Sequence, residues 1–162
     1  MIFQDPYASL NPRWRVRDII VEPVVARGGK TEGLAERLLE QVGLQDFAHR
    51  QISQLSGGQQ QRVFMARALA QGSEILLLDE PFAGVDPIAV EDIMRIVANL
   101  KHKGIGILIT DHNVHETLSI VDSAYILING TIFKDGTAEF LAEDEDVRKL
   151  YLGEKFKLDR YQ

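Results

Sequence analysis

The stretch ILLLDEP, residues 75–81, decides the fold. Its apolar residues follow one another without alternation, which predicts a short strand buried on both faces. Asp86 and Pro87 predict the N-cap and first residue of a helix that ends near Lys103. A second apolar run at 105–110 predicts another buried strand. Strand, helix and strand in this order predict a parallel sheet covered by helices, with right-handed crossovers.

The elements outside this unit follow from local signals. Apolar residues at helical spacing predict a helix that stops at Gly43 and another that begins after the glycines at 57–58. Asn-Gly at 129–130 predicts a hairpin turn. Asp-Gly at 135–136 predicts a further turn into a C-terminal helical tail. The sequence therefore predicts an α/β fold.

Composition excludes several classes of protein. The 162 residues carry 18 Lys and Arg against 24 Asp and Glu, a net charge of −6, and no cysteine. A disulfide scaffold, a thiolate metal site and a cysteine nucleophile are thereby excluded. The apolar runs are too short to span a membrane, and the first residues lack a secretion signal, so we expect a cytosolic protein. The acidic balance argues against nucleic acid as a partner.

The sequence LSGGQ, at 55–59, is the first motif that could carry chemistry. The two glycines allow close approach of a ligand to the backbone, and the start of a helix offers free N–H groups. With the Ser56 hydroxyl they would form an anion site, most naturally for phosphate. Taken alone, such a stretch is more often an ordinary turn.

Two further motifs follow predicted strands. Asp79 and Glu80 lie at the C-terminal end of the first strand, where α/β sheets bind ligands. Adjacent residues of a strand point their side chains to opposite faces, so Asp79 and Glu80 would have different tasks. Asp79 would hold a hydrated Mg²⁺, and Glu80 would orient or deprotonate a water. A helix-capping acid before a proline turn is the structural alternative. His112 follows the second strand, where a histidine either caps a helix or contacts a terminal phosphate.

In their order and spacing, these motifs resemble the nucleotide-binding domains of ABC-type ATPases, from Gln4 to about Gly153. The resemblance implies that Glu80 is the catalytic base and that His112 contacts the γ-phosphate. It assigns Mg²⁺ to Asp79 and Gln4. The positions that it matches to cofactor contacts with ATP are Gln4, Ser56, Gly57, Gly58, Gln59 and Asp86.

The same resemblance implies the domain organisation. Residues 1–162 would form one incomplete P-loop NTPase domain of the ABC type, a mostly parallel sheet flanked by helices. Residues 14–70 would be a small helical subdomain with the signature motif, and 71–136 the α/β core with the acids, the histidine and a C-terminal β-hairpin. Residues 137–162 would be a helical tail.

Different segments of this chain resemble different subgroups of the family. The segment from Gln4 to Arg13 resembles the ATPases of peptide and nickel importers, and the signature helix resembles those of metal-ion importers. Residues 79–159 are similar to the ATPase of lipopolysaccharide export. A transport-coupled ATP hydrolase, either export-like or import-like, is therefore implied.

One family motif has no counterpart in the sequence. The P-loop pattern G-x-x-x-x-G-K-[ST] should precede Gln4, and no such pattern occurs. We therefore expect this chain alone to bind ATP and Mg²⁺ weakly or not at all. In the family the P-loop strand lies between the strands predicted at 105–110 and 124–128. Without it those strands would close on each other, or the chain would fold poorly or recruit a partner.

The resemblance also implies partners and a location. They are a transmembrane permease, docked by residues 14–54, and a second nucleotide-binding domain, identical or related, at the cytoplasmic face of the inner or plasma membrane. The alternative is a catalytically incompetent module that presents only its signature face to a complete ATPase. DNA-repair ATPases are disfavoured because only about fifty residues, without heptads, separate Gln4 from the signature.

Overall fold

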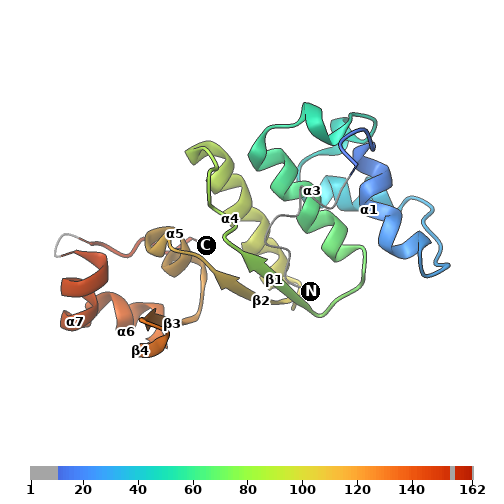
Figure 1. The fold of residues 1–162 in the computed structure, drawn as a ribbon. Coiled ribbons are helices and arrows are strands. Elements are labelled where there is room, and N and C mark those ends of the chain that lie inside the picture. Colours follow the sequence, from blue (N-terminus) through green and yellow to red (C-terminus); the bar gives the residue numbers. More distant parts are fainter. Residues whose placement is uncertain (1–10, 154–155, 162) are drawn as a thin grey trace. The chain divides into compact units, whose positions relative to one another are not determined.

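The computed structural model describes residues 11–153 and 156–161, so the predictions for Gln4 lie outside the described residues. Figure 1 traces the chain from α1 to the C-terminal helices. In chain order the elements are α1 (Val16–Val25), α2 (Leu34–Gln41), 3-10 turns at Gln45–Phe47 and Ile52–Gln54, α3 (Gly57–Leu69), β1 (Ile75–Asp79), α4 (Pro87–His102), β2 (Gly106–Thr110), α5 (Val114–Ile120), β3 (Ser123–Ile128), β4 (Thr131–Thr137), α6 (Ala138–Glu143), α7 (Glu145–Val147) and a π-helical turn at Arg148–Leu152.

The predicted strand-helix-strand unit is confirmed. β1 and β2 pair in parallel, with α4 as the connection between them. α4 begins as the sequence predicts, because Asp86 accepts a hydrogen bond from the backbone N–H of Ala89 and Pro87 is the first helical residue. It ends at His102, two residues before Gly104, whose φ is 80°.

The burial of these two strands differs from the prediction. β1 buries Leu76 and Leu78 but leaves Ile75 70% and Leu77 43% exposed, and Leu108 on β2 is 58% exposed. The prediction of strands buried on both faces is therefore wrong for this chain. An apolar run shows that a strand can be buried on both faces, but burial also needs a second layer of structure.

Three helices form the N-terminal part of the structure. α1 packs against α3, and α2 packs against both. Their buried faces supply fully enclosed side chains such as Ile19, Ile20, Leu39 and Val63. α2 ends two residues before Gly43, whose φ of 64° confirms the predicted stop.

The C-terminal part contains the predicted hairpin. β3 and β4 pair antiparallel around Asn129 and Gly130, with φ of 53° and 77°, as a type I′ turn requires. The predicted turn at 135–136 is wrong, because both residues pair with β3 and the strand continues to Thr137. The helical tail follows, and the buried core of this part is Leu118, Ile126, Ala138, Leu141 and Val147.

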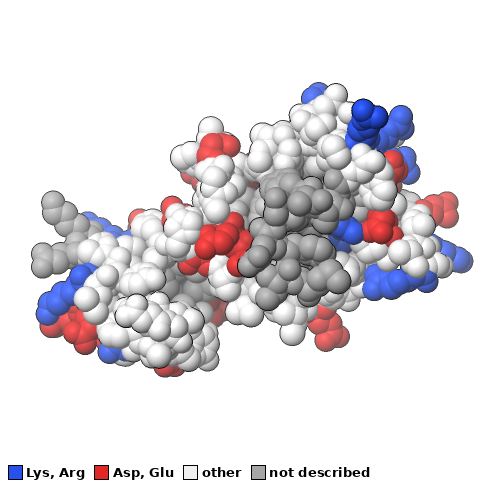
Figure 2. All heavy atoms as spheres, in the orientation of Figure 1, with Lys and Arg blue, Asp and Glu red and all other residues white. Residues whose placement is uncertain are grey.

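The chain divides into two units, Met1–Thr110 and Asp111–Gln162. In the part of the chain that the structure describes, unit 1 contains the two-stranded sheet β1-β2 and unit 2 the two-stranded sheet β3-β4, and no pairing of β2 with β3 is found. Figure 2 shows positive and negative side chains interspersed over the α1–α2 end of unit 1. No helix among the described residues is long and apolar enough to cross a membrane.

Candidate functional site

The signature motif forms the start of α3. Ser56 is the N-cap, and its hydroxyl accepts a hydrogen bond from the backbone N–H of Gln59 at 3.3 Å. The Gln59 side chain returns a bond to the Ser56 backbone N–H at 3.0 Å, which completes a capping box. A hydroxyl that accepts one bond still has its own proton to donate. The turn thus keeps a donor and the positive end of a 13-residue helix.

The two glycines of this turn have different surroundings. A Cβ at Gly57 would meet nothing within 4 Å, whereas a Cβ at Gly58 would lie 2.4 Å from Cβ of Ala89. Gly58 therefore allows close packing of α3 on α4, and Gly57 leaves open space at the helix start. Since Asp86 binds the N–H of Ala89, the structure also brings the signature turn and Asp86 together.

The carboxyl ends of β1 and β2 carry the predicted acids. Asp79 is paired with Thr110 in the parallel register, and the Thr110 hydroxyl donates a hydrogen bond to the Asp79 carboxylate. Asp79 lies on the exposed face of β1. Its oxygens and the Thr110 hydroxyl are hard ligands of the kind that Mg²⁺ prefers.

Glu80 leaves the strand in an unusual conformation. Its φ is 50°, in the left-handed region that disfavours residues other than glycine, asparagine and aspartate. Its backbone N–H donates to the Thr110 carbonyl at 2.7 Å, and its carbonyl accepts from Ala83 N–H at 3.1 Å. These two bonds hold the strained backbone at the end of the strand. Because Glu80 is no longer in β1, strand alternation does not determine where its side chain points.

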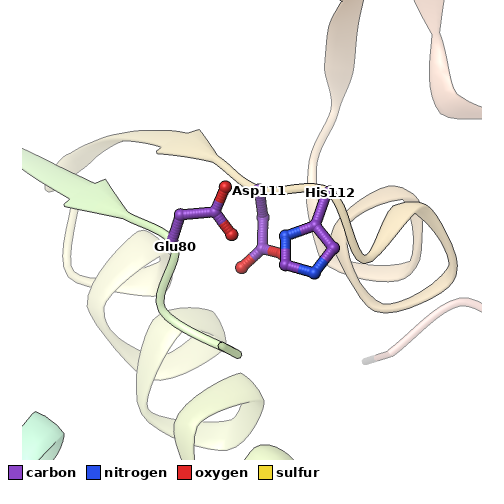
Figure 3. A group of neighbouring side chains, drawn as sticks. All are labelled: Glu80, Asp111 and His112. Atoms are coloured by element: carbon purple, nitrogen blue, oxygen red, sulfur yellow. The ribbon is translucent and has the colours of Figure 1, made fainter. Parts of the chain in front are cut away.

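Unit 2 begins with Asp111 and His112. Figure 3 shows that these residues come from the segment directly after β2, and that Glu80 comes from the end of β1. The Asp111 carboxylate accepts bonds from the backbone and side-chain N–H groups of Asn113, at 2.8 and 2.9 Å. His112 Nδ1 lies 3.7 Å from Asp111 Oδ1, and the imidazole is 70% exposed. At this distance the contact is electrostatic and not a hydrogen bond.

Sequence reasoning did not single out Asp111 as a site residue. Its position directly before His112 was the available signal. It also did not find an ion pair between Arg67 of α3 and Glu22 of α1, whose atoms are 2.5 Å apart. No local pattern links residues 45 positions apart in the sequence.

The family of the chain follows from comparison with known proteins. A sequence profile described as "ABC transporter" matches residues 1–83, about half of the chain. The chain belongs to the ABC transporter family. This confirms the resemblance to ABC-type ATPases, and the matched residues include the signature at 55–59 and the acids at 79–80.

Two relatives of known name align with most of this chain. The lipopolysaccharide export system ATP-binding protein LptB of Haemophilus influenzae is 49% identical over 76% of the chain and 52% of the relative. The protein of the same name from Escherichia coli K12 is 47% identical over 78% of the chain and 53% of its own length. The chain spans about half the length of these relatives.

Solved structures of ABC transporter cassettes confirm the fold. CbiO1 of Clostridium perfringens, part of the transporter complex cbiONQ, has a TM-score of 0.79 and 28% identity, covering 92% of this chain and 61% of that one. The ADP conformation of the cassette MJ1267 has a TM-score of 0.75 and 29% identity over 88% and 64% of the two chains. The α/β fold of a partial ABC cassette is thereby established.

Proposed function

We propose that this chain is the C-terminal part of an ATP-hydrolysing ABC transporter subunit whose complete form energises transport through a permease. The observation that carries the proposal is the start of α3, where Ser56, Gly57 and Gly58 form a capped turn with open space at Gly57. A phosphate suits such a turn, because N–H groups and the helix dipole favour an anion.

Each site residue has a proposed role. Glu80 acts as base toward the attacking water, and Asp79 together with Gln4 contacts Mg²⁺, which supplies charge stabilisation when bound. Ser56, Gly57, Gly58 and Gln59 contact the γ-phosphate of ATP held by a second nucleotide-binding domain. Asp86 lies at the seam between the two domains, and His112 contacts the γ-phosphate.

Lipopolysaccharide export is the proposed transport class. It is supported by the 47–49% identity to LptB proteins over about three quarters of the chain. The peptide-importer resemblance of the segment from Gln4 to Arg13 supports peptide import as a second candidate. In either class the permease would dock on residues 14–54, at the cytoplasmic face of the membrane.

Replacement of Glu80 tests the proposed hydrolysis. A P-loop segment from the Escherichia coli relative is joined in front of the chain, and ATP turnover is measured with Glu80 and with Glu80→Gln. Loss of a general base predicts a decrease of at least about 100-fold. Glu74→Gln is the matched control, since Glu74 precedes β1 and is exposed. Equal turnover with Glu80→Gln would overturn the role of Glu80.

The alternative function is a module that supplies only its signature turn to a complete ATPase. It is supported by the capped turn at Ser56 with open space at Gly57, which can contact a phosphate without the acids after β1. Under this alternative, Glu80→Gln leaves turnover of the assembled ATPase unchanged while Ser56→Ala lowers it. Isothermal titration of the chain alone with Mg²⁺-ATP complements the test, because micromolar binding would contradict the expected weak affinity.

A further inference from the structure

Thr110, the last residue of β2, contacts both acids at the end of β1. Its hydroxyl donates a hydrogen bond to Oδ1 of Asp79, which lies directly opposite in the parallel register. Its backbone carbonyl accepts a hydrogen bond from the N–H of Glu80 at 2.7 Å. One residue of the neighbouring strand thus holds the side chain at 79 and the backbone at 80.

The hydroxyl bond orients the Asp79 carboxylate. A hydroxyl that donates to a carboxylate forms a charge-assisted bond, which is stronger than a bond between neutral groups. Threonine is β-branched and has few χ1 rotamers, so its hydroxyl is directed with little loss of side-chain entropy. Asp79 and Thr110 are both exposed, and the bond determines which way the carboxylate faces.

The oriented carboxylate has one oxygen left for a cation. Oδ1 accepts the Thr110 proton, and Oδ2 of Asp79 accepts no hydrogen bond from the described residues. Ca²⁺ takes about six to eight oxygen ligands and can bind both oxygens of one carboxylate, whereas Mg²⁺ keeps several waters and needs only one or two carboxylates. A single available oxygen at an exposed strand end therefore fits a hydrated Mg²⁺ better than Ca²⁺.

The carbonyl bond acts on Glu80 in a different way. The φ of Glu80 is 50°, a conformation that persists in a glutamate only where the surrounding structure holds it. Glu80 directly follows the last paired residue of β1, so its bond to Thr110 extends the strand pairing by one hydrogen bond. Because this bond uses backbone atoms alone, a change of the Thr110 side chain leaves it in place.

We propose that Thr110 is a positioning residue for both acids, and that its hydroxyl holds the Asp79 carboxylate in the orientation that favours Mg²⁺ over Ca²⁺. Its carbonyl holds the backbone of Glu80 at the end of β1. The inference rests on the proposed function, because that function assigns a divalent cation to Asp79. It adds the residue that sets the choice of ion.

Competition between metal ions tests the hydroxyl in the native chain without nucleotide. The probe is Mn²⁺, a paramagnetic ion that broadens the NMR signals of nearby amides, here those of residues 78–80. The Mg²⁺ and the Ca²⁺ concentrations that halve this broadening are measured, and the lower one should be that of Mg²⁺. Thr110→Val keeps the shape of the side chain without its hydroxyl. We expect it to raise the required Mg²⁺ concentration about tenfold and the Ca²⁺ concentration less.

Three variants separate the hydroxyl from the shape of the side chain. Thr110→Ala should lose the preference for Mg²⁺ as Thr110→Val does, and Thr110→Ser should restore it. Thr131→Val is the matched control, because the Thr131 hydroxyl donates to the Ile128 carbonyl instead of an acid. A purely structural role of Thr110 predicts a lower thermal midpoint with an unchanged ratio of the two concentrations. That result, or a native preference for Ca²⁺, would overturn the role of the hydroxyl.

Hydrogen exchange tests the bond to Glu80. The Glu80 amide should exchange at least about tenfold more slowly than an unstructured peptide, because it is hydrogen-bonded at the end of a strand. The same protection should remain in Thr110→Val, which keeps the carbonyl. An unprotected Glu80 amide in the native chain would overturn the backbone part of the inference.

Asp79→Ala distinguishes failure of this inference from failure of the proposed function. It should abolish the Mn²⁺ broadening at residues 78–80. Broadening that persists in Asp79→Ala, or that is missing from the native chain at millimolar Mn²⁺, would overturn the proposed metal contact of Asp79 and the ion choice with it. If Asp79→Ala abolishes the broadening while Thr110→Val leaves the ion ratio unchanged, the metal contact stands and only the role of Thr110 fails.

Discussion

At residue 80 the chain combines a proposed catalytic carboxylate with a left-handed backbone. The φ of 50° is maintained by the backbone bonds to Thr110 and Ala83. Such conformations cost about 1–3 kcal/mol in residues other than glycine and occur preferentially at functional sites. The strain thus fixes the direction in which the side chain leaves β1.

Glycine at this position should relieve the strain. We expect Glu80→Gly to raise the free energy of unfolding by about 1 kcal/mol, because glycine adopts positive φ without steric cost but gains entropy in the unfolded chain. Urea unfolding measures the change. Glu80→Gln keeps the strained backbone and removes only the charge, so it should leave stability unchanged. A stabilised Glu80→Gln would show that charge, and not backbone strain, is responsible.

At the scale of elements, the contact between α3 and α4 depends on the absence of one side chain. Gly58 lies against Ala89, two residues into α4. The same contact positions the signature turn beside the Asp86 cap. A proposed nucleotide-binding glycine is therefore also a packing residue.

Alanine at the two signature glycines should separate these roles. Gly58→Ala should lower the free energy of unfolding by about 2 kcal/mol, because its Cβ would overlap Ala89 and separate the helices. Gly57→Ala should be neutral or slightly stabilising, since its Cβ points into open space and alanine favours helix. Thermal unfolding followed by circular dichroism compares them. Equal destabilisation would contradict the assigned packing role.

The elements that sequence predicts well are those set by local chemistry. The Asp86 cap, the stop at Gly43 and the turn at 129–130 depend only on adjacent residues. Gly136 is different, because its pairing with Ala124 on β3 overrides the turn preference of its own dipeptide. Burial of β1 is also non-local, since it depends on a second layer. The ion pair between Glu22 and Arg67 could not be predicted, because its residues are far apart in the sequence. The Ser56 capping box, in contrast, follows from a four-residue pattern.

At the scale of the whole molecule, the chain consists of two units with separate cores. In unit 2, Lys134 Nζ lies 2.9 Å from Asp144 Oδ2, which ties β4 to the cap of α7. The hydrogen bond from Lys134, with a backbone bond from Val147, lowers the pKa of the Asp144 carboxyl. The same hydrogen bond raises the pKa of Lys134.

These shifts predict a dependence of stability on pH. The lowered pKa of Asp144 contributes stability above the unfolded value of about 3.9, and this contribution is lost as pH falls through the folded pKa. The raised pKa of Lys134 contributes stability below the unfolded value of about 10.4. This contribution is lost as pH rises through the folded pKa of Lys134. Asp144→Asn keeps a capping side chain but removes the charge. Its thermal midpoint should therefore lie below that of the native chain at neutral pH and approach it in acid. Glu143→Gln, an exposed neighbour, should show no such convergence.

The exposed apolar residues of β1 have a consequence for the handling of the protein. β1 and β2 form a two-stranded sheet, so each has one edge without a pairing strand among the described residues, beside exposed Ile75 and Leu77. Short apolar β-strands of low charge with open edges template aggregation. We expect Ile75→Lys to increase the soluble fraction after concentration roughly twofold without lowering the thermal midpoint. Light scattering during concentration measures it, with Ile88→Lys, on exposed α4 surface, as the control. If both lysines act alike, general solubility and not the strand edge limits the concentration at which this chain can be studied.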